Sequence, residues 1–219
     1  MRNPARVLGP ALVLALPTQL VAQDLQAICR EMGKVTVGQW ASYSLTGSSE
    51  GTARFAIVGT EQQDTATLYW YEMNMNISKG EGAGRGPMIM QLLVPGVDKA
   101  GNVRAMVMKA GSEPAMRLPQ QMVGMMAGRA GANNVVTANA RRCSGGEVVG
   151  WESVTVPAGT IRALHVKGAD GDAWLATGVP FGLVKAVGTG REMVLTGRGA
   201  DGKSSITETP QEMPGMPPR

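Results

Sequence analysis

The chain has few of the side chains that usually build catalytic and metal centres. Among 219 residues it contains one histidine, His165, and two cysteines, Cys29 and Cys143. Zinc sites need clusters of histidine and cysteine, and thiol redox sites need a C-x-x-C spacing, so the sequence predicts neither kind of site. We therefore expect no catalytic residue, no metal ligand and no cofactor.

Long hydrophobic runs are also missing. No stretch reaches the ~20 apolar residues that a membrane-spanning helix needs. The run Leu8–Leu16 is shorter, follows the basic residues Arg2 and Arg6, and precedes a small residue, Ala22. This order is typical of an export signal, so we predict a signal peptide at 1–22, cleavage after Ala22 and a periplasmic protein.

A strong charge of one sign is absent as well. The formal charge of +4 includes two arginines of the predicted signal peptide, so the mature chain is nearer +2. No lysine-arginine run and no basic helix with interleaved aromatics occurs, so we expect no nucleic-acid partner. The remaining ~197 residues fit one domain, which we place at 23–207. The tail 208–219 has four prolines and little to bury, which predicts disorder.

The two cysteines both fall in the predicted mature chain. In an oxidising compartment Cys29 and Cys143 could form one disulfide that closes a long loop. The alternative is two unrelated thiols. Export favours the disulfide, because disulfides form and persist outside the reducing cytosol.

Alternation along short segments is the dominant pattern that the sequence does contain. From Thr67 to Ile77, every second residue is apolar or aromatic, beginning with Tyr69 and Tyr71 and continuing with methionines. Alternate side chains of a strand point to opposite faces, so these residues share one face. Strands are predicted here, in "GPMIMQLLVP", "NVRAMVMKA", "VTVGQWASYSLT", "ARFAIVG", "EVVGWESVTVP", "TIRALHVKG", "DAWLAT", "GLVKAVG", "REMVLTG" and "SSITET". Turn-like separators between so many short strands favour a meandering antiparallel sheet.

Two segments have helical patterns. Asp24 to Met32 follows the predicted cleavage site, and Asp24 is expected to cap a short helix there. A second helix is predicted from Pro119 to Gly128, with Met122, Met125 and Met126 on one face at spacings of three and four. The following "GRAGANN" is expected to be a loop.

The second half of the chain contains the most specific motifs. "VPAGT" opens a predicted strand, and a tryptophan strand, "DAWLAT", leads into "VPFGLVK". These motifs resemble exported bacterial domains that are similar to the lipoprotein carriers LolA and LolB, and the resemblance covers most of residues 35–207. It implies a mainly β (α+β) fold, with a curved antiparallel sheet that forms an unclosed half barrel and one or two helices over its apolar concave face. It also implies a lipid carrier, a lipoprotein shuttle or a sensor domain, although no arginine here matches the one that helps the carriers hold their cargo.

Fifteen methionines accompany only two phenylalanines, and three interpretations of them remain open. Methionine is flexible enough to fill irregular gaps in a core. Methionine surfaces also adapt to apolar ligands, so a concave face rich in methionine could hold an acyl chain. Thioethers also select Cu(I), although the single histidine lies far away along the sequence.

Binding of an apolar ligand, without catalysis, is the function that we predict. The ligand is a lipid, a lipoprotein acyl chain or another apolar molecule, and the alternatives are a Cu(I)-binding envelope protein and a structural envelope protein without a ligand. We expect a monomer that touches the envelope membrane transiently. The binding surface requires that the three methionine strands are neighbours in a register that puts their methionines on one face. The predicted lining residues are Tyr69, Tyr71, Met73, Met75, Met88, Met90, Met106, Met108, Met122, Met125 and Met126.

Three features that could indicate an enzyme are interpreted otherwise. "GSSEG" at 47–51 matches the G-x-S-x-G of hydrolases, but the segments on both sides are predicted strands, so we expect a hairpin turn. Glu72 lies between Tyr71 and Met73 and points to the opposite face, so we do not expect a buried acid. His165 is expected to be an ordinary residue on a half-exposed strand.

Overall fold

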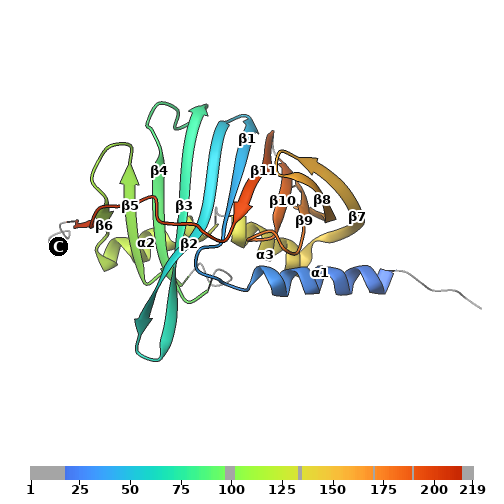
Figure 1. Cartoon of the computed structure of the whole chain (residues 1–219), viewed down its shortest axis with the longest axis horizontal. Helices are drawn as coiled ribbons and strands as arrows, with labels where there is room; N and C mark the ends of the chain where they lie inside the picture. The colour runs from blue at the N-terminus through green and yellow to red at the C-terminus, as the bar shows by residue number, and fades with distance from the viewer. Residues whose placement is uncertain (1–17, 97–101, 133–134, 170, 189, 214–219) are drawn as a thin grey trace, which may run out of the picture.

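Twelve β-strands and three α-helices make up the described part of the chain (Figure 1). The computed structural model describes residues 18–96, 102–132, 135–169, 171–188 and 190–213, so most of the predicted signal peptide lies outside it. The helices are α1 (Thr18–Met32), α2 (Gln120–Ala132) and α3 (Val135–Gly145). The strands are β1 (Trp40–Gly47), β2 (Glu50–Gln63), β3 (Ala66–Lys79), β4 (Met88–Val94), β5 (Ala105–Ala110), β6 (Met116–Arg117), β7 (Glu147–Val156), β8 (Gly159–Gly168), β9 (Gly171–Leu175), β10 (Leu183–Gly188), β11 (Arg191–Gly199) and β12 (Gln211–Glu212).

All of these strands belong to one curved sheet, in the order β12-β6-β5-β4-β3-β2-β1-β11-β10-β9-β8-β7. The pairings are antiparallel except that of β12 with β6. The pairing of β1 with β11 joins the two halves of the chain. Among the described strands, the edge strands β12 and β7 do not pair with each other, so the half barrel stays open. The predicted fold class is confirmed.

The methionine strands β3, β4 and β5 are neighbours in the predicted register. Met73 lies opposite Met90, and Met75 lies opposite Met88, across β3 and β4. Met90 in turn lies opposite Met108 across β4 and β5. Directly opposed residues of an antiparallel pair share a face of the sheet. The assumption that these methionines share one face is therefore confirmed.

The three helices cover the concave face of the sheet, where the predicted number was one or two (Figure 1). Leu25 and Ile28 of α1 and Val123 of α2 are buried in the same core as Tyr71 of β3. Short helices are marginal alone, so packing of these apolar faces on the sheet provides most of their stability.

The helix boundaries differ from the prediction. Because α1 begins at Thr18, Asp24 is not a helix cap, and its side chain instead accepts a hydrogen bond of 2.8 Å from the Trp151 indole. The predicted loop "GRAGANN" is helical up to Ala132, and α3 was not predicted. α3 contacts β8 and α1, and such tertiary packing overrides a weak local preference for helix.

The prediction that Met125 lies on the apolar face of α2 is wrong. Met122 and Met126 pack against the core, but Met125 is 62% exposed. Val123 and Ala127 are buried beside Met126, so the sheet-facing side of the helix is rotated away from Met125.

Residues 200–213, which we call the C-terminal strap, run across the convex face from the end of β11 to β6 (Figure 1). "SSITET" lies in this strap and is not a strand. The prediction of disorder from residue 208 is wrong for 208–213, because Glu208 pairs with Lys109 and β12 pairs with β6. Residues 214–219 lie outside the described residues.

The strap also covers Glu72. This side chain points away from the concave face, as predicted, but it is fully buried, contrary to expectation.

Candidate functional site

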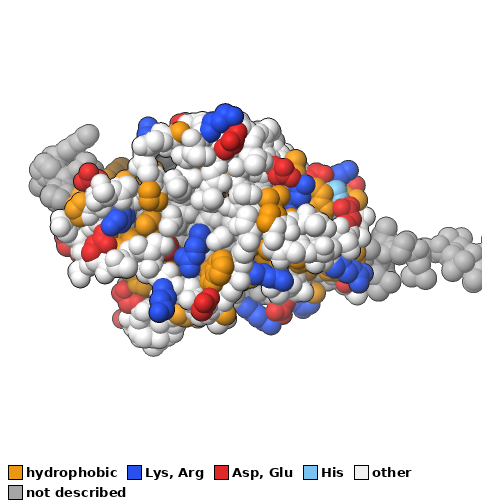
Figure 2. Space-filling view, turned by 45° about the horizontal axis from the view of Figure 1, so that its top comes forward, with side chains coloured by type: hydrophobic (Ala, Val, Ile, Leu, Met, Phe, Trp, Pro, Cys, Tyr) orange, Lys and Arg blue, Asp and Glu red, His pale blue; other side chains and the backbone are white. Residues whose placement is uncertain are grey.

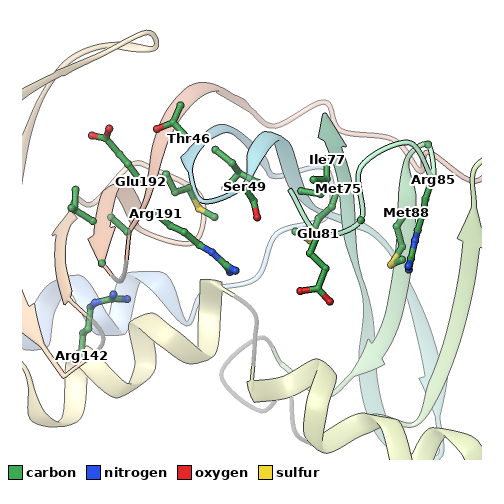
Figure 3. A pocket seen from close by; sticks show the side chains of 17 residues that line it. Thr46, Ser49, Met75, Ile77, Glu81, Arg85, Met88, Arg142, Arg191 and Glu192 are labelled. Atoms are coloured by element: carbon green, nitrogen blue, oxygen red, sulfur yellow. The ribbon is translucent and has the colours of Figure 1, made fainter. Parts of the chain in front are cut away.

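A cavity of about 740 Å³ opens at one end of the half barrel (Figure 3). We call it the mouth cavity. It lies where the β1–β2, β3–β4 and β10–β11 connections meet, and its volume falls in the range of ~300–1,000 Å³ typical of small-molecule sites. Figure 2 shows hydrophobic side chains and Lys or Arg side chains around a hollow on this side of the molecule. The apolar wall of the cavity is formed by Leu45, Met75, Ile77, Met88, Val187 and Met193.

Strand register brings this apolar wall together from two parts of the sheet. Leu45 lies opposite Met193 across β1 and β11, and Met75 lies opposite Met88 across β3 and β4. Met75 and Met88 are 38% and 41% exposed, which is high for large hydrophobic side chains. Flexible thioether side chains that face one cavity can adapt to apolar ligands of different shapes.

Three arginines lie at the same opening, each from a different element. Arg85 belongs to the β3–β4 connection, Arg142 to α3 and Arg191 to the start of β11. In Figure 3 the guanidinium group of Arg191 points into the cavity. Its Nε donates a hydrogen bond of 3.0 Å to Ser48 Oγ, and Arg142 donates one of 3.4 Å to Asn139.

Two carboxylates, Glu81 and Glu192, also line the cavity. Glu192 accepts a hydrogen bond of 2.6 Å from Lys185, so its negative charge is compensated by this lysine and not by the arginines of the cavity. Glu81 reaches in from the β3–β4 connection, on the side opposite Arg191 (Figure 3). The opening therefore combines an apolar wall with an excess of positive charge.

Beneath the helices, the concave face carries an aromatic cluster. Phe55 and Tyr71 stack with ring centroids 6.2 Å apart, and Phe181 meets Tyr71 edge-on at 5.6 Å. Tyr43 donates its hydroxyl to Leu183 O at 3.0 Å, whereas the buried Tyr71 hydroxyl has no hydrogen-bond partner in the described part of the chain. Burial, and to a lesser degree Tyr43, raises the pKa of Tyr71 well above its ordinary value.

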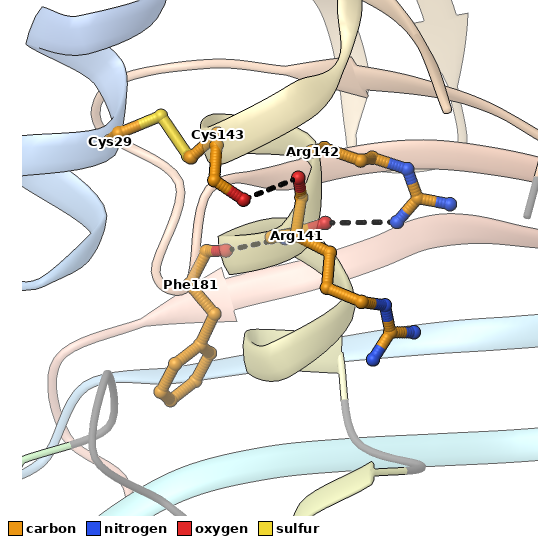
Figure 4. The surroundings of a disulfide bond; sticks show 7 residues. Cys29, Arg141, Arg142, Cys143 and Phe181 are labelled. Atoms are coloured by element: carbon orange, nitrogen blue, oxygen red, sulfur yellow. Dashed lines mark hydrogen bonds between the residues drawn. A yellow bond between two sulfur atoms is a disulfide. The ribbon is translucent and has the colours of Figure 1, made fainter. Parts of the chain in front are cut away.

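A disulfide joins α1 to α3 beside this cluster (Figure 4). Cys29 and Cys143 are bonded, with Cα atoms 5.9 Å apart, which confirms the predicted bond. Asn139 of α3 donates to Phe181 O at 3.0 Å and so attaches α3 to the β9–β10 connection. α2 contains no cysteine. The disulfide therefore fixes α1 and α3 to each other and leaves α2 as the cover without a covalent link.

The predicted lining residues divide between the open mouth and a filled core. Met75 and Met88 line the cavity, and Met125 lies on the exposed side of α2. The rest are fully buried or pack against the core: Tyr69, Tyr71, Met73, Met90, Met106, Met108, Met122 and Met126.

Sequence reasoning missed Leu45, Met193 and the arginines. Leu45 had a usable signal, because it continues the alternation of Tyr43 along its strand. No local signal could place Arg191, because only the meeting of three connections brings it to the cavity.

His165 also differs from expectation, because the structure buries it to 8% exposure. Its two ring nitrogens lie 2.9 Å from carboxylate oxygens of Glu152 and Asp172, and its ring stacks on Trp174 at 4.4 Å. Hydrogen bonds from the Trp174 indole and then from His165 lower the pKa of Glu152. Since both ring nitrogens are hydrogen-bonded to carboxylates, the imidazole is not available as a base for the serines of "GSSEG". "GSSEG" itself forms the β1–β2 turn, as predicted.

Comparisons with family models, with curated proteins and with solved structures give no match to this chain. Inference of its function therefore rests on the geometry above. No helix in the described part of the chain is long and apolar enough to cross a membrane.

Proposed function

We propose that this protein is a non-catalytic periplasmic carrier or receptor that binds the acyl chain of a lipid or lipoprotein, or another apolar ligand, in the mouth cavity. The observation that carries the proposal is the cavity itself, with Met75 and Met88 exposed on its wall. The resemblance of the sequence to LolA-like domains supports the same class of ligand. An open sheet with helices on one face is the architecture that this resemblance implies.

A chain at the open mouth keeps part of its surface in water, because Met75 and Met88 of the wall are themselves 38% and 41% exposed. Each methylene contributes ~0.8 kcal/mol only when it is fully buried. Association costs ~4–15 kcal/mol, which incomplete burial offsets poorly. A chain held only at the mouth therefore binds weakly, and tight binding requires that the chain continue between the sheet and a helix.

α2 is the helix that we expect to shift. Its thirteen residues include Gly124, Gly128 and Gly131, and a glycine inside a helix costs ~1 kcal/mol relative to alanine. α1 and α3 are joined by their disulfide, whereas α2 is held by packing of Met122, Val123 and Met126. A shift of α2 would extend the mouth cavity along the methionines of β4 and β5.

The disulfide between Cys29 and Cys143 supports the export that the sequence predicts, because such bonds persist mainly in oxidising compartments. Cleavage after Ala22 would keep Leu25, Ile28 and the cysteine of α1 in the mature protein. In this proposal the protein is a monomer that meets the envelope membrane only to exchange its ligand.

The test is mass spectrometry of an organic extract from mature protein purified without detergent, followed by binding of hexadecanol to delipidated protein. Met88→Gln places an amide on the cavity wall, and Met125→Gln makes the same change on an exposed methionine outside it. We expect a copurified lipid, and loss of hexadecanol binding only in Met88→Gln. An empty protein that binds no hexadecanol, or equal effects of the two substitutions, would contradict the proposal and favour a structural role.

Cu(I) binding is a second candidate, favoured by one observation. Met73, Met90, Met108 and Met116 are directly opposed across β3, β4, β5 and β6, so four thioethers form one row. Thioethers are ligands that select Cu(I). Titration against a Cu(I) chelator tests this candidate, which predicts tight binding that Met90→Leu removes.

A further inference from the structure

We infer that the ligand of the mouth cavity is an anionic amphiphile, whose carboxylate or phosphate headgroup binds between Arg191 and Arg85 while its chain enters past Met75 and Met88. This inference rests on the proposed function and adds the chemistry of the headgroup. It commits the cavity to one occupant, a single-chain molecule with an acid group at one end.

Arg191 is positioned to receive an acid group. Its Nε–H is used by Ser48 Oγ, which fixes the guanidinium plane and leaves the terminal N–H groups directed into the cavity (Figure 3). Within the described residues, no carboxylate lies within ion-pair distance of Arg191. A guanidinium held by one hydrogen bond is pre-organised for the two parallel bonds that a carboxylate or phosphate accepts.

Arg85 provides the second cation from the other side of the opening. It lies between Gly84 and Gly86, whose φ values of +79° and +74° form a turn that other residues rarely adopt. In Figure 3 its side chain runs beside Met88, so a headgroup bound there is next to the apolar wall. Arg85 also has no ion-pair partner among the residues that the structure describes.

The charge balance of the opening favours an anion. Arg85 and Arg191 contribute two positive charges, and Glu192 is compensated by Lys185. Glu81 is the remaining carboxylate of the lining. Because it reaches toward the same space as Arg191, it competes with a bound acid group for that arginine, and its removal is expected to strengthen binding.

The experiment compares ligands that share a chain and differ in the headgroup. Delipidated mature protein is titrated with palmitate, with hexadecanol, with a lysophosphatidic acid and with inorganic phosphate. We expect the two anionic amphiphiles to bind about tenfold or more tightly than hexadecanol, with an advantage that decreases in high salt. Inorganic phosphate alone is expected not to bind measurably, because the chain supplies most of the affinity.

Matched variants assign the headgroup site. Arg191→Gln and Arg85→Gln should each reduce the advantage of palmitate over hexadecanol about tenfold, with hexadecanol affinity unchanged. Arg191→Lys should retain part of the advantage of palmitate over hexadecanol. Arg198→Gln removes an exposed arginine of β11 outside the cavity lining and should change neither ligand. Glu81→Gln should increase palmitate affinity.

The outcomes separate this inference from the proposed function. Equal binding of palmitate and hexadecanol, or an anionic preference that Arg191→Gln and Arg85→Gln leave intact, would overturn the headgroup site and leave the acyl-chain proposal standing. Failure of every amphiphile to bind would overturn both. Phosphate binding as tight as that of lysophosphatidic acid would show an anion site that needs no chain, and would also overturn the inference.

Discussion

Glu72 and Ser205 are bonded to each other although 133 positions separate them in the sequence. The Glu72 carboxylate accepts the Ser205 backbone N–H at 3.0 and 3.1 Å and the Ser205 hydroxyl at 2.7 Å. Gln91 at 2.8 Å and the Ser204 hydroxyl at 3.2 Å add two donors, and Arg54 lies 3.5 Å away. A buried charge is tolerated only with such partners, so this contact attaches the C-terminal strap to the convex face.

Glu72→Gln is the first prediction. The amide places an NH₂ group against donors that now point at a carboxylate, so we expect a loss of about 1–3 kcal/mol in the free energy of unfolding. Urea denaturation measures the loss. Glu147→Gln, an exposed carboxylate on the edge strand β7, is the control and should change stability by less than about 0.5 kcal/mol. Equal effects of the two changes would mean that the strap is not held by this carboxylate.

Removal of the disulfide is the second prediction. Cys29 and Cys143 close a loop across 114 positions, so the double substitution to serine should lower the free energy of unfolding by about 2–4 kcal/mol. Reduction of the wild-type protein should produce the same loss and should have no effect on the double variant. A reductant that destabilises both proteins alike would show that the loss has another origin.

A pair of glycines separates backbone strain from packing. Gly178 and Gly182 both have φ of +75°, but a Cβ on Gly182 would lie 2.2 Å from Met32 Sδ, and one on Gly178 would meet nothing within 4 Å. Gly178→Ala should cost about 1–2 kcal/mol from backbone strain alone. Gly182→Ala should cost a further ~1–3 kcal/mol, because α1 must move away from the turn.

The same pair in a Met32→Ala background provides the control. Without the methionine side chain, thermal denaturation should give similar losses for Gly178→Ala and Gly182→Ala. A persistent difference would locate the extra cost outside the contact with α1.

Acid should loosen the C-terminal strap. The Trp40 indole lowers the pKa of Asp201 below its ordinary 3.8, and Lys109 lowers that of Glu208 below its ordinary 4.5. A lowered pKa means that the folded state binds the proton less tightly than the unfolded state. The stabilisation is therefore complete above the ordinary values and is lost as the pH falls through the lowered ones.

Denaturation midpoints measured from about pH 7 to about pH 2 test this dependence. The variant with Asp201→Asn and Glu208→Gln should be less stable than the wild type at neutral pH and should lose less stability on acidification. Parallel curves for the two proteins would count against these carboxylates as the acid-sensitive groups.

Gly124→Ala tests whether α2 is the moving cover. A Cβ at Gly124 would meet nothing within 4 Å, so alanine should stabilise the helix by about 1 kcal/mol. If ligand entry requires α2 to bend or unwind at its glycines as it shifts, association should slow. Gly145→Ala, at the end of α3 and equally open, is the control and should leave the association rate unchanged. Stopped-flow binding of a fluorescent fatty acid measures both rates.

The sequence by itself determined the faces and turns of the sheet. Alternation has a local cause, because successive side chains of a strand point to opposite sides whatever surrounds it. Tyr71, Met73 and Glu72 were therefore assigned to their correct faces, and "GSSEG" to a hairpin turn, before any pairing was known.

Only the tertiary structure decided what covers each face. Glu72 and His165 are buried by partners from other strands or from the strap, and nothing in their own segments indicates that burial. Met125 was placed wrongly because helix spacing gives the relative directions of side chains but not the rotation of the helix on the sheet. Arg85 and Arg191 reach one cavity because β1 pairs with β11. This pairing brings together connections that lie far apart along the chain.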